Sequence, residues 1–369
     1  MPQEITIIGG NVSGLAAAYY LTQKGYYVTV YEAKIWNKPC GGAISLEFEK
    51  YLHEELNIEL EESDHYTERF KVGLWTGRYM EDVGIFRITT RYDLQQKLIN
   101  QVKEIPNIDI KFKRVSTKDT DLFTLQTIVA TGYSGFTNKV MNRRWKFQDK
   151  ALILRFDGDF KGVSYPNANL IVLDHVKMGY GWVFVGKNDH LNVGVGAIAS
   201  KDYVWKRYCE FFNLIKNKYG YSLDQPSAKP QAWILPLPVN KKNHPVSNTK
   251  NGIEFIGVGD VLGLAHPLSG AGIEPAWQSS WVLAECAENY RINVEKYKSL
   301  LIKNLRMSSW RRLDHLISHI SRKRIPFKST LGFFALHLIR HRLLKMMRKY
   351  HWFSLVHDGE KETGFKILL

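Results

Sequence analysis

The first thirty-two residues alternate between apolar runs, glycines and polar positions in the order of a strand, a helix and a second strand. Ile5, Ile7 and Ile8 form a short apolar strand, a glycine turn follows, and a helical stretch leads to a strand over residues 28–31. In such a βαβ unit the helix N-terminus offers unpaired N–H groups to a pyrophosphate. The pattern therefore predicts that the chain begins with a dinucleotide-binding unit.

Individual residues of this unit have distinct expected roles. Gly9 allows a sharp turn off the first strand, Gly14 removes a side chain where the helix packs on the sheet, and Glu32 stands where a carboxylate accepts ribose hydroxyls. Asn11 replaces the middle glycine of G-x-G-x-x-G, and asparagine tolerates unusual backbone angles better than most residues. We expect nucleotide contacts from Gly9, Gly10, Asn11, Ser13, Gly14 and Glu32.

Farther along the chain the apolar period changes from that of helices to that of strands and back. A helix is predicted over residues 93–102, strands over 111–115 and 125–130, and an alternating, strand-like pattern over 151–198. The pattern thus predicts an α/β fold with a Rossmann-like nucleotide domain, an inserted antiparallel β-sheet domain and a helical C-terminal tail. The predicted boundaries are 1–65, 86–150 and 251–295 for the first domain, 66–85 and 151–250 for the inserted sheet domain, and 296–369 for the tail.

A second glycine-rich segment distinguishes a flavin from a nicotinamide cofactor. Gly259 and Asp260 end a late strand, and the glycine-rich loop after them opens another helix. A carboxylate there suits ribityl hydroxyls, and a helix N-terminus suits the N1/C2 carbonyl side of a reduced flavin. Arg91 is expected to reach the cofactor backbone, the alternative being a surface arginine. We expect FAD, with further contacts from Gly259, Asp260, Pro267, Gly270, Ala271 and Gly272.

Four stretches of the chain resemble the FAD-dependent geranylgeranyl reductase family, within the wider class of aromatic-hydroxylase-like flavoproteins. They are GGNVSG with Glu32, KPCGGAIS at 38–45, GYGWVFVGKNDHLNVGVG at 179–196 and GDVLGLAHPLSGAGI at 259–273. The resemblance implies a Rossmann-like FAD-binding domain and a substrate-binding sheet. It also implies reduction of C=C bonds in a prenyl lipid by hydride transfer from N5 of the reduced flavin.

The same resemblance assigns roles to residues outside the nucleotide unit. The family lines its lipid cavity with Tyr-x-Trp-x-Phe-Pro, matched by Tyr180, Trp182 and Phe184, whereas Val185 replaces the proline and allows a different cavity wall. Cys40 is placed beside the flavin ring and is expected to supply or relay a proton, the alternative being a packing role. The electron donor stays open between NAD(P)H and a reduced carrier.

Charge and cysteine content add expectations about partners and location. The net charge is +15, and the segment 306–351 holds twelve Lys and Arg against one acid, Asp314, which gives it +11. This basic segment is a solvated helical cap, or it contacts an anionic membrane surface or a protein partner, and no nucleic acid is expected. Cys40, Cys209 and Cys286 are far apart and form no Cys-x-x-Cys pair, which indicates a reducing cytoplasm and no metal site. We expect a cytoplasmic protein that is peripheral to the membrane if the basic segment contacts lipid.

Two functional alternatives accompany the reductase hypothesis. A flavin monooxygenase that hydroxylates an aromatic group, free or carried on a partner protein, shares the cofactor and fold but requires oxygen. A flavoprotein that binds or matures a partner protein through the basic segment is the other. Under both the reductase and the monooxygenase hypothesis, the substrate is expected to be apolar or aromatic.

Overall fold

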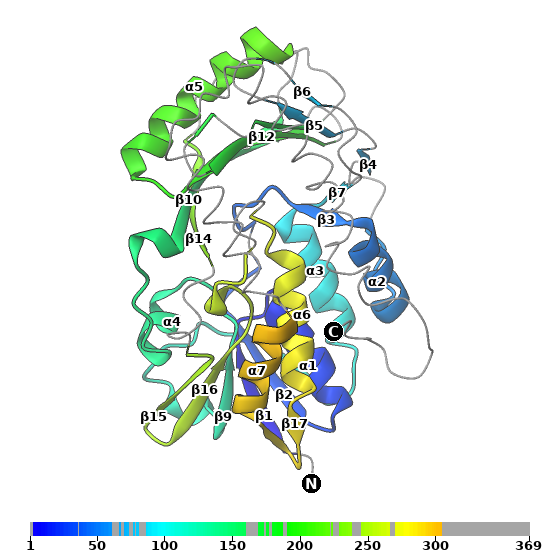
Figure 1. Ribbon diagram of the computed structural model, residues 1–369. Helices are drawn as coiled ribbons and strands as arrows, with labels where there is room; N and C mark the ends of the chain where they lie inside the picture. The colour runs from blue at the N-terminus through cyan, green and yellow to red at the C-terminus, as the bar shows by residue number, and fades with distance from the viewer. Residues whose placement is uncertain are drawn as a thin grey trace.

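Two large sheets with their helices form the two halves of the protein. The computed structural model describes residues 3–35, 37–60, 66–67, 70–73, 77, 79–80, 86–159, 169–172, 175–176, 179–186, 190–221, 223, 229–237, 245–265 and 270–304. A mainly parallel sheet with α1, α6 and α7 lies in the lower half of Figure 1, and a mainly antiparallel sheet with α5 lies in the upper half. This confirms the predicted α/β class with a Rossmann-like sheet and separate antiparallel sheets.

The parallel sheet is built from strands that are distant in sequence. Its order is β15-β16-β9-β1-β2-β8, and only β15 runs antiparallel to its neighbour. Four of the five residues of β1 are buried, as expected when helices cover both faces of a parallel sheet. The strands are β1 Glu4–Ile8, β2 Tyr27–Glu32, β8 Ile108–Phe112, β9 Gln126–Val129, β15 Ser247–Lys250 and β16 Ile253–Gly257.

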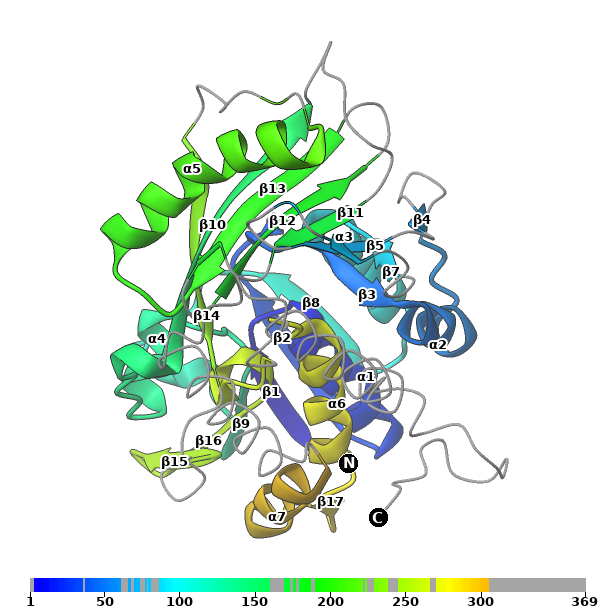
Figure 2. The same cartoon turned by 45° about the horizontal axis from the view of Figure 1, so that its top comes forward.

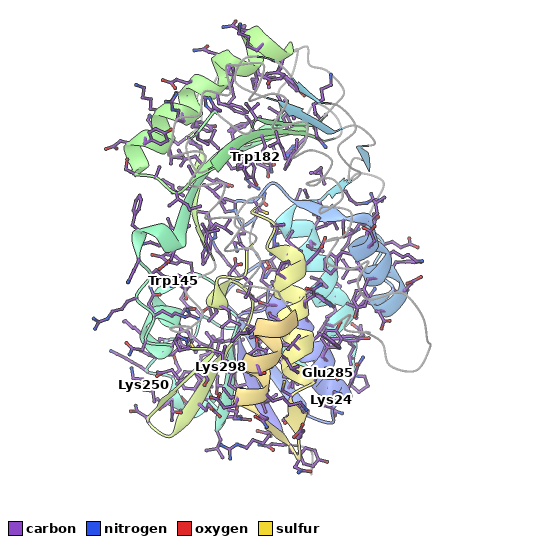
Figure 3. The ribbon with its side chains drawn as sticks, viewed as in Figure 1. Lys24, Trp145, Trp182, Lys250, Glu285 and Lys298 are labelled. Carbon is purple, nitrogen blue, oxygen red and sulfur yellow. The ribbon has the colours of Figure 1, made fainter. Side chains whose placement is uncertain are left out.

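Helices α1 and α6 pack against one another beside this sheet. The Ser280 hydroxyl donates to the carbonyl oxygen of Ser13 at 2.7 Å, and the fully buried Trp277 donates its indole N–H to the Tyr20 hydroxyl at 2.9 Å. An exposed ion pair of 2.9 Å joins the ends of the two helices, and Figure 3 labels its members, Lys24 and Glu285. The helices around the sheet are α1 Val12–Gln23, α2 Leu46–Leu56, α3 Arg91–Val102, α4 Gly135–Val140, α6 Ile273–Ala284 and α7 Val294–Asn304, with short 3-10 turns η1 Thr120–Leu122, η2 Phe147–Asp149 and η4 Gly259–Leu262.

The second sheet has seven strands in the order β14-β10-β13-β12-β11-β5-β6. Helix α5, Lys201–Tyr219, lies across one face of it, as Figure 2 shows, and buries aromatic residues such as Phe211 there. The opposite face is therefore the one that faces the parallel sheet. The strands are β5 Phe70–Gly73, β6 Tyr79–Met80, β10 Lys150–Asp159, β11 Asn169–Val172, β12 Gly179–Val185, β13 His190–Ala197 and β14 Gln231–Pro236; smaller sheets hold β3 Ala43–Ser45, β4 Tyr66–Thr67 and β7 Phe86–Ile88, and β17 Ala287–Glu288 and β18 Arg291–Ile292.

Two details of the structure differ from the sequence prediction. The strand expected over 111–115 is β8, Ile108–Phe112, because its register follows β2, where Val28 pairs with Ile108. Strand β15 joins the parallel sheet, although the predicted boundary at residue 250 places it with the inserted sheet. The domain division as a whole stays a prediction. The basic segment 306–351 lies outside the described residues, and no helix among those described is long and apolar enough to cross a membrane.

Candidate active site

The turn after β1 brings backbone groups closer together than any side chain would permit. Gly9 has a φ of +106°, and a Cβ there would lie 2.7 Å from the carbonyl group of Ala130. A Cβ on Gly14 would lie 1.8 Å from the carbonyl oxygen of Gly9. Both positions therefore need glycine, and α1 starts beside the turn, where its first N–H groups lack intrahelical acceptors.

Glu32 ends β2, where the sequence predicted a carboxylate, and its oxygens already accept several hydrogen bonds. Oε2 accepts from the N–H of Gly10 at 2.7 Å and from Nε2 of Gln95 at 3.3 Å. Oε1 accepts from the N–H groups of Ala33 at 2.6 Å and Lys34 at 3.2 Å. The carboxylate thus fixes the glycine turn to the end of β2, and its contact with a ribose stays a prediction.

Asn11 and Arg91 meet at the N-terminus of α1. Asn11 is the N-cap, and its Oδ1 accepts from the N–H of Val12 at 2.9 Å and from Nη2 of Arg91. Arg91 is buried, so it is not a surface arginine. Nδ2 of Asn11 and Nε of Arg91 are also buried, and neither has a hydrogen-bond partner in the described part of the chain. Because buried polar atoms are normally satisfied, this pair fits a polar group of a bound cofactor, such as the pyrophosphate of FAD.

The two glycine-rich segments are packed together. Gly259 has a φ of +63°, and a Cβ there would lie 2.6 Å from the hydroxyl oxygen of Ser13. The N–H of Gly259 donates to the hydroxyl of Ser279 in α6 at 2.9 Å. The fold therefore joins the two segments that the sequence separates, as one cofactor spanning both requires.

Asp260 follows Gly259 and forms an ion pair that sequence analysis did not predict. Its carboxylate pairs with Nζ of Lys38, and the two side chains are 12 % and 16 % exposed. Nζ of Lys38 also lies 5.3 Å from the ring centroid of Trp233, within cation–π range. A Cβ on Gly272, the N-cap of α6, would lie 3.5 Å from Oδ1 of Asp260. Ribityl hydroxyls at Asp260 would therefore share the carboxylate with Lys38.

The loop that carries Cys40 has no room for larger residues. A Cβ on Gly41 would lie 2.4 Å from the Phe184 ring, and one on Gly42 would lie 2.0 Å from the carbonyl oxygen of Thr89. Gly42 also has a φ of +78°, and its N–H donates to the Cys40 sulfur at 3.4 Å. The loop is thus wedged between β12 and the start of α3, with the half-buried thiol inside it.

Two side chains of the antiparallel sheet hold the backbone of this loop. The carbonyl oxygen of Cys40 accepts from Nη1 of Arg155 at 3.0 Å and from Nδ2 of Asn192 at 2.9 Å. Arg155 is 1 % exposed and pairs with Asp157 at 3.1 Å and with Oε1 of Gln231 at 2.6 Å. Burial lowers the pKa of Arg155, and the charge of Asp157 opposes that shift.

The three predicted substrate residues form one aromatic row on β12. They alternate along the strand, so their rings share the face opposite α5, with centroids 5.8 Å apart for Tyr180 and Trp182 and 6.3 Å for Trp182 and Phe184. Figure 3 labels Trp182 in this sheet. A Cβ on Gly270 would lie 3.0 Å from the Tyr180 hydroxyl oxygen. The row therefore lies between the Cys40 loop and the predicted flavin loop.

Tyr180 is held in its neutral form. Burial, with a smaller contribution from the Cys40 sulfur, raises the pKa of its hydroxyl well above the ordinary value. The hydroxyl is therefore a proton carrier at physiological pH and not an anion. Gly270, Ala271 and Gly272 follow in the same region, whereas Pro267 lies outside the described residues.

Sequence analysis missed four polar residues of this site. Arg155 has the clearest signal, because a charged residue interrupts an otherwise apolar strand pattern. Lys38 and Asn192 stand inside stretches that carry the family resemblance but have no assigned role there. Gln95 lies on a predicted helix with nothing to mark it. For the predicted contacts other than Pro267 the structure gives placement, and the roles of all of them toward cofactor and substrate stay predictions.

Comparison with known proteins agrees with this arrangement. Residues 7–56 match the family model of the NAD(P)-binding Rossmann-like domain. The digeranylgeranylglycerophospholipid reductase of Sulfolobus acidocaldarius is 23 % identical over 76 % of this chain and 68 % of its own length. A solved geranylgeranyl bacteriochlorophyll reductase-like protein of Thermoplasma acidophilum superposes with a TM-score of 0.59 at 18 % identity, over 85 % of this chain and 84 % of its own. The chain is thus similar in sequence and fold to geranylgeranyl reductase-like flavoproteins. It is a flavin-dependent oxidoreductase.

The same fold occurs in other flavoproteins. The solved flavin-dependent brominase Bmp2 superposes with a TM-score of 0.63 at 13 % identity, over 95 % of this chain and all of its own. Similarity at that level shows the fold alone. The reaction must therefore be argued from the side chains of the site.

We expect Glu32→Ala to weaken FAD binding by about 1–3 kcal/mol, because the buried ribose hydroxyls of FAD would lose a charged acceptor. Fluorescence titration of the apoprotein with FAD measures the affinity. Glu285→Ala, which removes only one side of the exposed ion pair with Lys24, is the matched control and should leave the affinity unchanged. An unaltered FAD affinity in Glu32→Ala would refute the assignment of this carboxylate to the cofactor site.

Proposed function

We propose that the protein reduces C=C bonds of an isoprenoid lipid with FAD as its cofactor. The observation that carries the proposal is the aromatic row of β12 lying between the Cys40 loop and the segment at Gly270. An unactivated alkene has no charge and no hydrogen-bonding group, so a protein must bind it through apolar side chains and leave only the paths of the proton and the hydride open. The related lipid reductase of Sulfolobus acidocaldarius supports the substrate class.

The residues present fit FAD in two places. The orphaned polar atoms of Asn11 and Arg91 suit its pyrophosphate, and Asp260 beside the α6 N-terminus suits its ribityl chain. When bound and reduced, FAD supplies the hydride for one carbon of the double bond. The electron donor that reduces it is either NAD(P)H or a reduced carrier.

The chain's own residues bind the alkene and move the proton. Trp182 and Phe184 are 4 % and 6 % exposed, so their apolar rings exclude water from the place proposed for the prenyl chain. We assign the proton for the second carbon to Cys40, which directly precedes the glycine packed against the Phe184 ring. In this scheme Cys40 is the donor and the aromatic row orients the substrate.

A monooxygenase that hydroxylates an aromatic group is the second candidate. The observation in its favour is the row of rings on β12, because aromatic substrates also suit stacking against aromatic side chains. The two reactions differ in their need for oxygen.

Turnover under strict anaerobiosis separates the two candidates. With chemically reduced FAD and a geranylgeranyl lipid, we expect the flavin to reoxidise and the product to gain two hydrogens per double bond without oxygen. An aromatic substrate added in place of the lipid should leave the flavin reduced. If the flavin is not reoxidised without oxygen, and oxygen is consumed only when substrate is present, the protein is a monooxygenase and the reductase proposal is refuted.

We expect Cys40→Ala to keep FAD and its visible spectrum but to lower the reductase rate by about 10²-fold or more, the contribution typical of a positioned general acid. Cys40→Ser, which replaces the thiol by a hydroxyl group that still carries a proton, should retain more activity than Cys40→Ala. Single-turnover reoxidation of the reduced flavin by substrate measures the step directly. A wild-type rate in Cys40→Ala would reduce this residue to a packing role.

We further propose that the basic segment 306–351 holds the protein at an anionic membrane, where its lipid substrate resides. Exposed charge attraction is screened over a Debye length of about 8 Å at physiological ionic strength, so binding should fall steeply with salt. Reversal of several charges between Arg340 and Lys349 should abolish sedimentation with vesicles containing anionic lipid and leave the flavin spectrum intact. Equal sedimentation of wild type and variant at low salt would contradict the membrane role. Co-sedimentation with an acidic protein, and not with vesicles, would show that the segment binds a protein partner.

A further inference from the structure

The side chain of Asn192 touches both the aromatic row and the Cys40 loop. Its Oδ1 accepts the indole N–H of Trp182 at 2.8 Å, and its Nδ2 donates to the carbonyl oxygen of Cys40 at 2.9 Å. The orientation of the amide follows from chemistry, because an indole N–H only donates and a carbonyl only accepts. Asn192 is 7 % exposed, so water does not compete for either bond.

The sheet geometry places the indole against this amide. Trp182 pairs with Gly194 across β12 and β13, and a Cβ on Gly194 would lie 2.2 Å from the Trp182 ring. The ring thus occupies the space that the glycine leaves open. Asn192 lies two residues before Gly194 on β13, and therefore on the same face, where it meets the nitrogen of the indole.

Arg155 holds the same carbonyl oxygen of Cys40 from β10 of the antiparallel sheet. Its remaining partners given above are Asp157 and Gln231, which lie on the antiparallel sheet. The two donors together use both lone pairs of the carbonyl oxygen. Arg155 therefore anchors the loop to the sheet, and Asn192 adds a connection from the loop to a ring of the substrate-facing row.

We propose that Asn192 is a positioning residue that couples the Trp182 ring to the Cys40 loop, so that a prenyl chain seated on the row and the Cys40 thiol keep a fixed relation. The proposal rests on the proposed function for the roles of Trp182 and Cys40. The coupling itself is measurable without turnover, because the reactivity of the Cys40 thiol reports on the loop.

A double-mutant cycle on thiol reactivity tests the coupling. In the FAD-loaded protein carrying Cys209→Ala and Cys286→Ala, Cys40 is the sole thiol, and its alkylation by iodoacetamide is followed by mass spectrometry. We expect Asn192→Leu to speed alkylation several-fold, Trp182→Phe to speed it less, and the double variant to match Asn192→Leu, since contacting residues are non-additive. Additive effects, or an unchanged rate in Asn192→Leu, would overturn the proposal.

The variant Asn192→Asp distinguishes the two hydrogen bonds of the side chain. In its ionised form the new carboxylate keeps an acceptor for the Trp182 indole and removes the donor to the Cys40 carbonyl. We expect its thiol reactivity to follow Asn192→Leu, with KM for the prenyl lipid near wild type and kcat lowered about tenfold, as for a slightly misplaced catalytic group. A proportional change of KM and kcat together with a lowered Tm would indicate a merely structural role and refute the coupling.

Asn248 provides the matched control. Its Nδ2 donates to the carbonyl oxygen of Val140 at 2.7 Å, a side-chain-to-backbone bond of the same kind on β15, which lies at the far edge of the parallel sheet in Figure 1. Asn248→Leu should leave Cys40 alkylation unchanged, whereas equal acceleration in that variant would refute a specific link. If no prenyl lipid is turned over but the non-additivity at Asn192 persists, the coupling is supported and only the substrate assignment fails.

Discussion

The position of the candidate site depends on one buried cation, Arg155. A guanidinium that is 1 % exposed is costly unless charged and polar groups surround it. Asp157 and Gln231 supply partners from the antiparallel sheet, and the third partner is the carbonyl oxygen of Cys40. Because Cys40 lies in the loop that follows β2, this requirement draws a loop of the nucleotide-binding half onto the other sheet. The thiol, the aromatic row and the second glycine-rich segment meet there as a consequence.

The glycines of the site have a packing role that follows from this closeness. Gly41 leaves space for the Phe184 ring and Gly194 for the Trp182 ring, and a Cβ at either position would lie within 2.4 Å of ring carbons. Even a methyl group would therefore push the rings out of line or lift the loop from the sheet. The glycine content of these stretches thus reflects close packing, at Gly41 between the loop and the antiparallel sheet and at Gly194 within that sheet, in addition to any contact with a cofactor.

The local part of this architecture was predictable from sequence and the long-range polar part was not. The βαβ unit, the place of Glu32 and the alternation on β12 follow from period and turn chemistry, which involve neighbours along the chain. The pair of Lys38 and Asp260 joins residues 222 positions apart, and nothing in either local sequence indicates it. The burial of Arg155 has the same origin, because its partners come from three separate segments. The bounds predicted for β8 were wrong for a related reason, since its pairing with β2 determines them.

Fold similarity at 13–18 % identity includes both a reductase-like protein and a brominase, so the scaffold does not decide the chemistry. The surroundings of the thiol are more informative. Cys40 lies near a hydroxyl that burial keeps neutral and beside a buried aromatic row, and the charges of Arg155 and Asp157 neutralise one another beneath the loop. Buried aromatic surroundings and a neutral hydroxyl suit the addition of hydrogen to a hydrocarbon double bond. Because Arg155 and Asn192 both hold the loop backbone, the loop keeps its position against the aromatic row without the substrate having any polar group to bind.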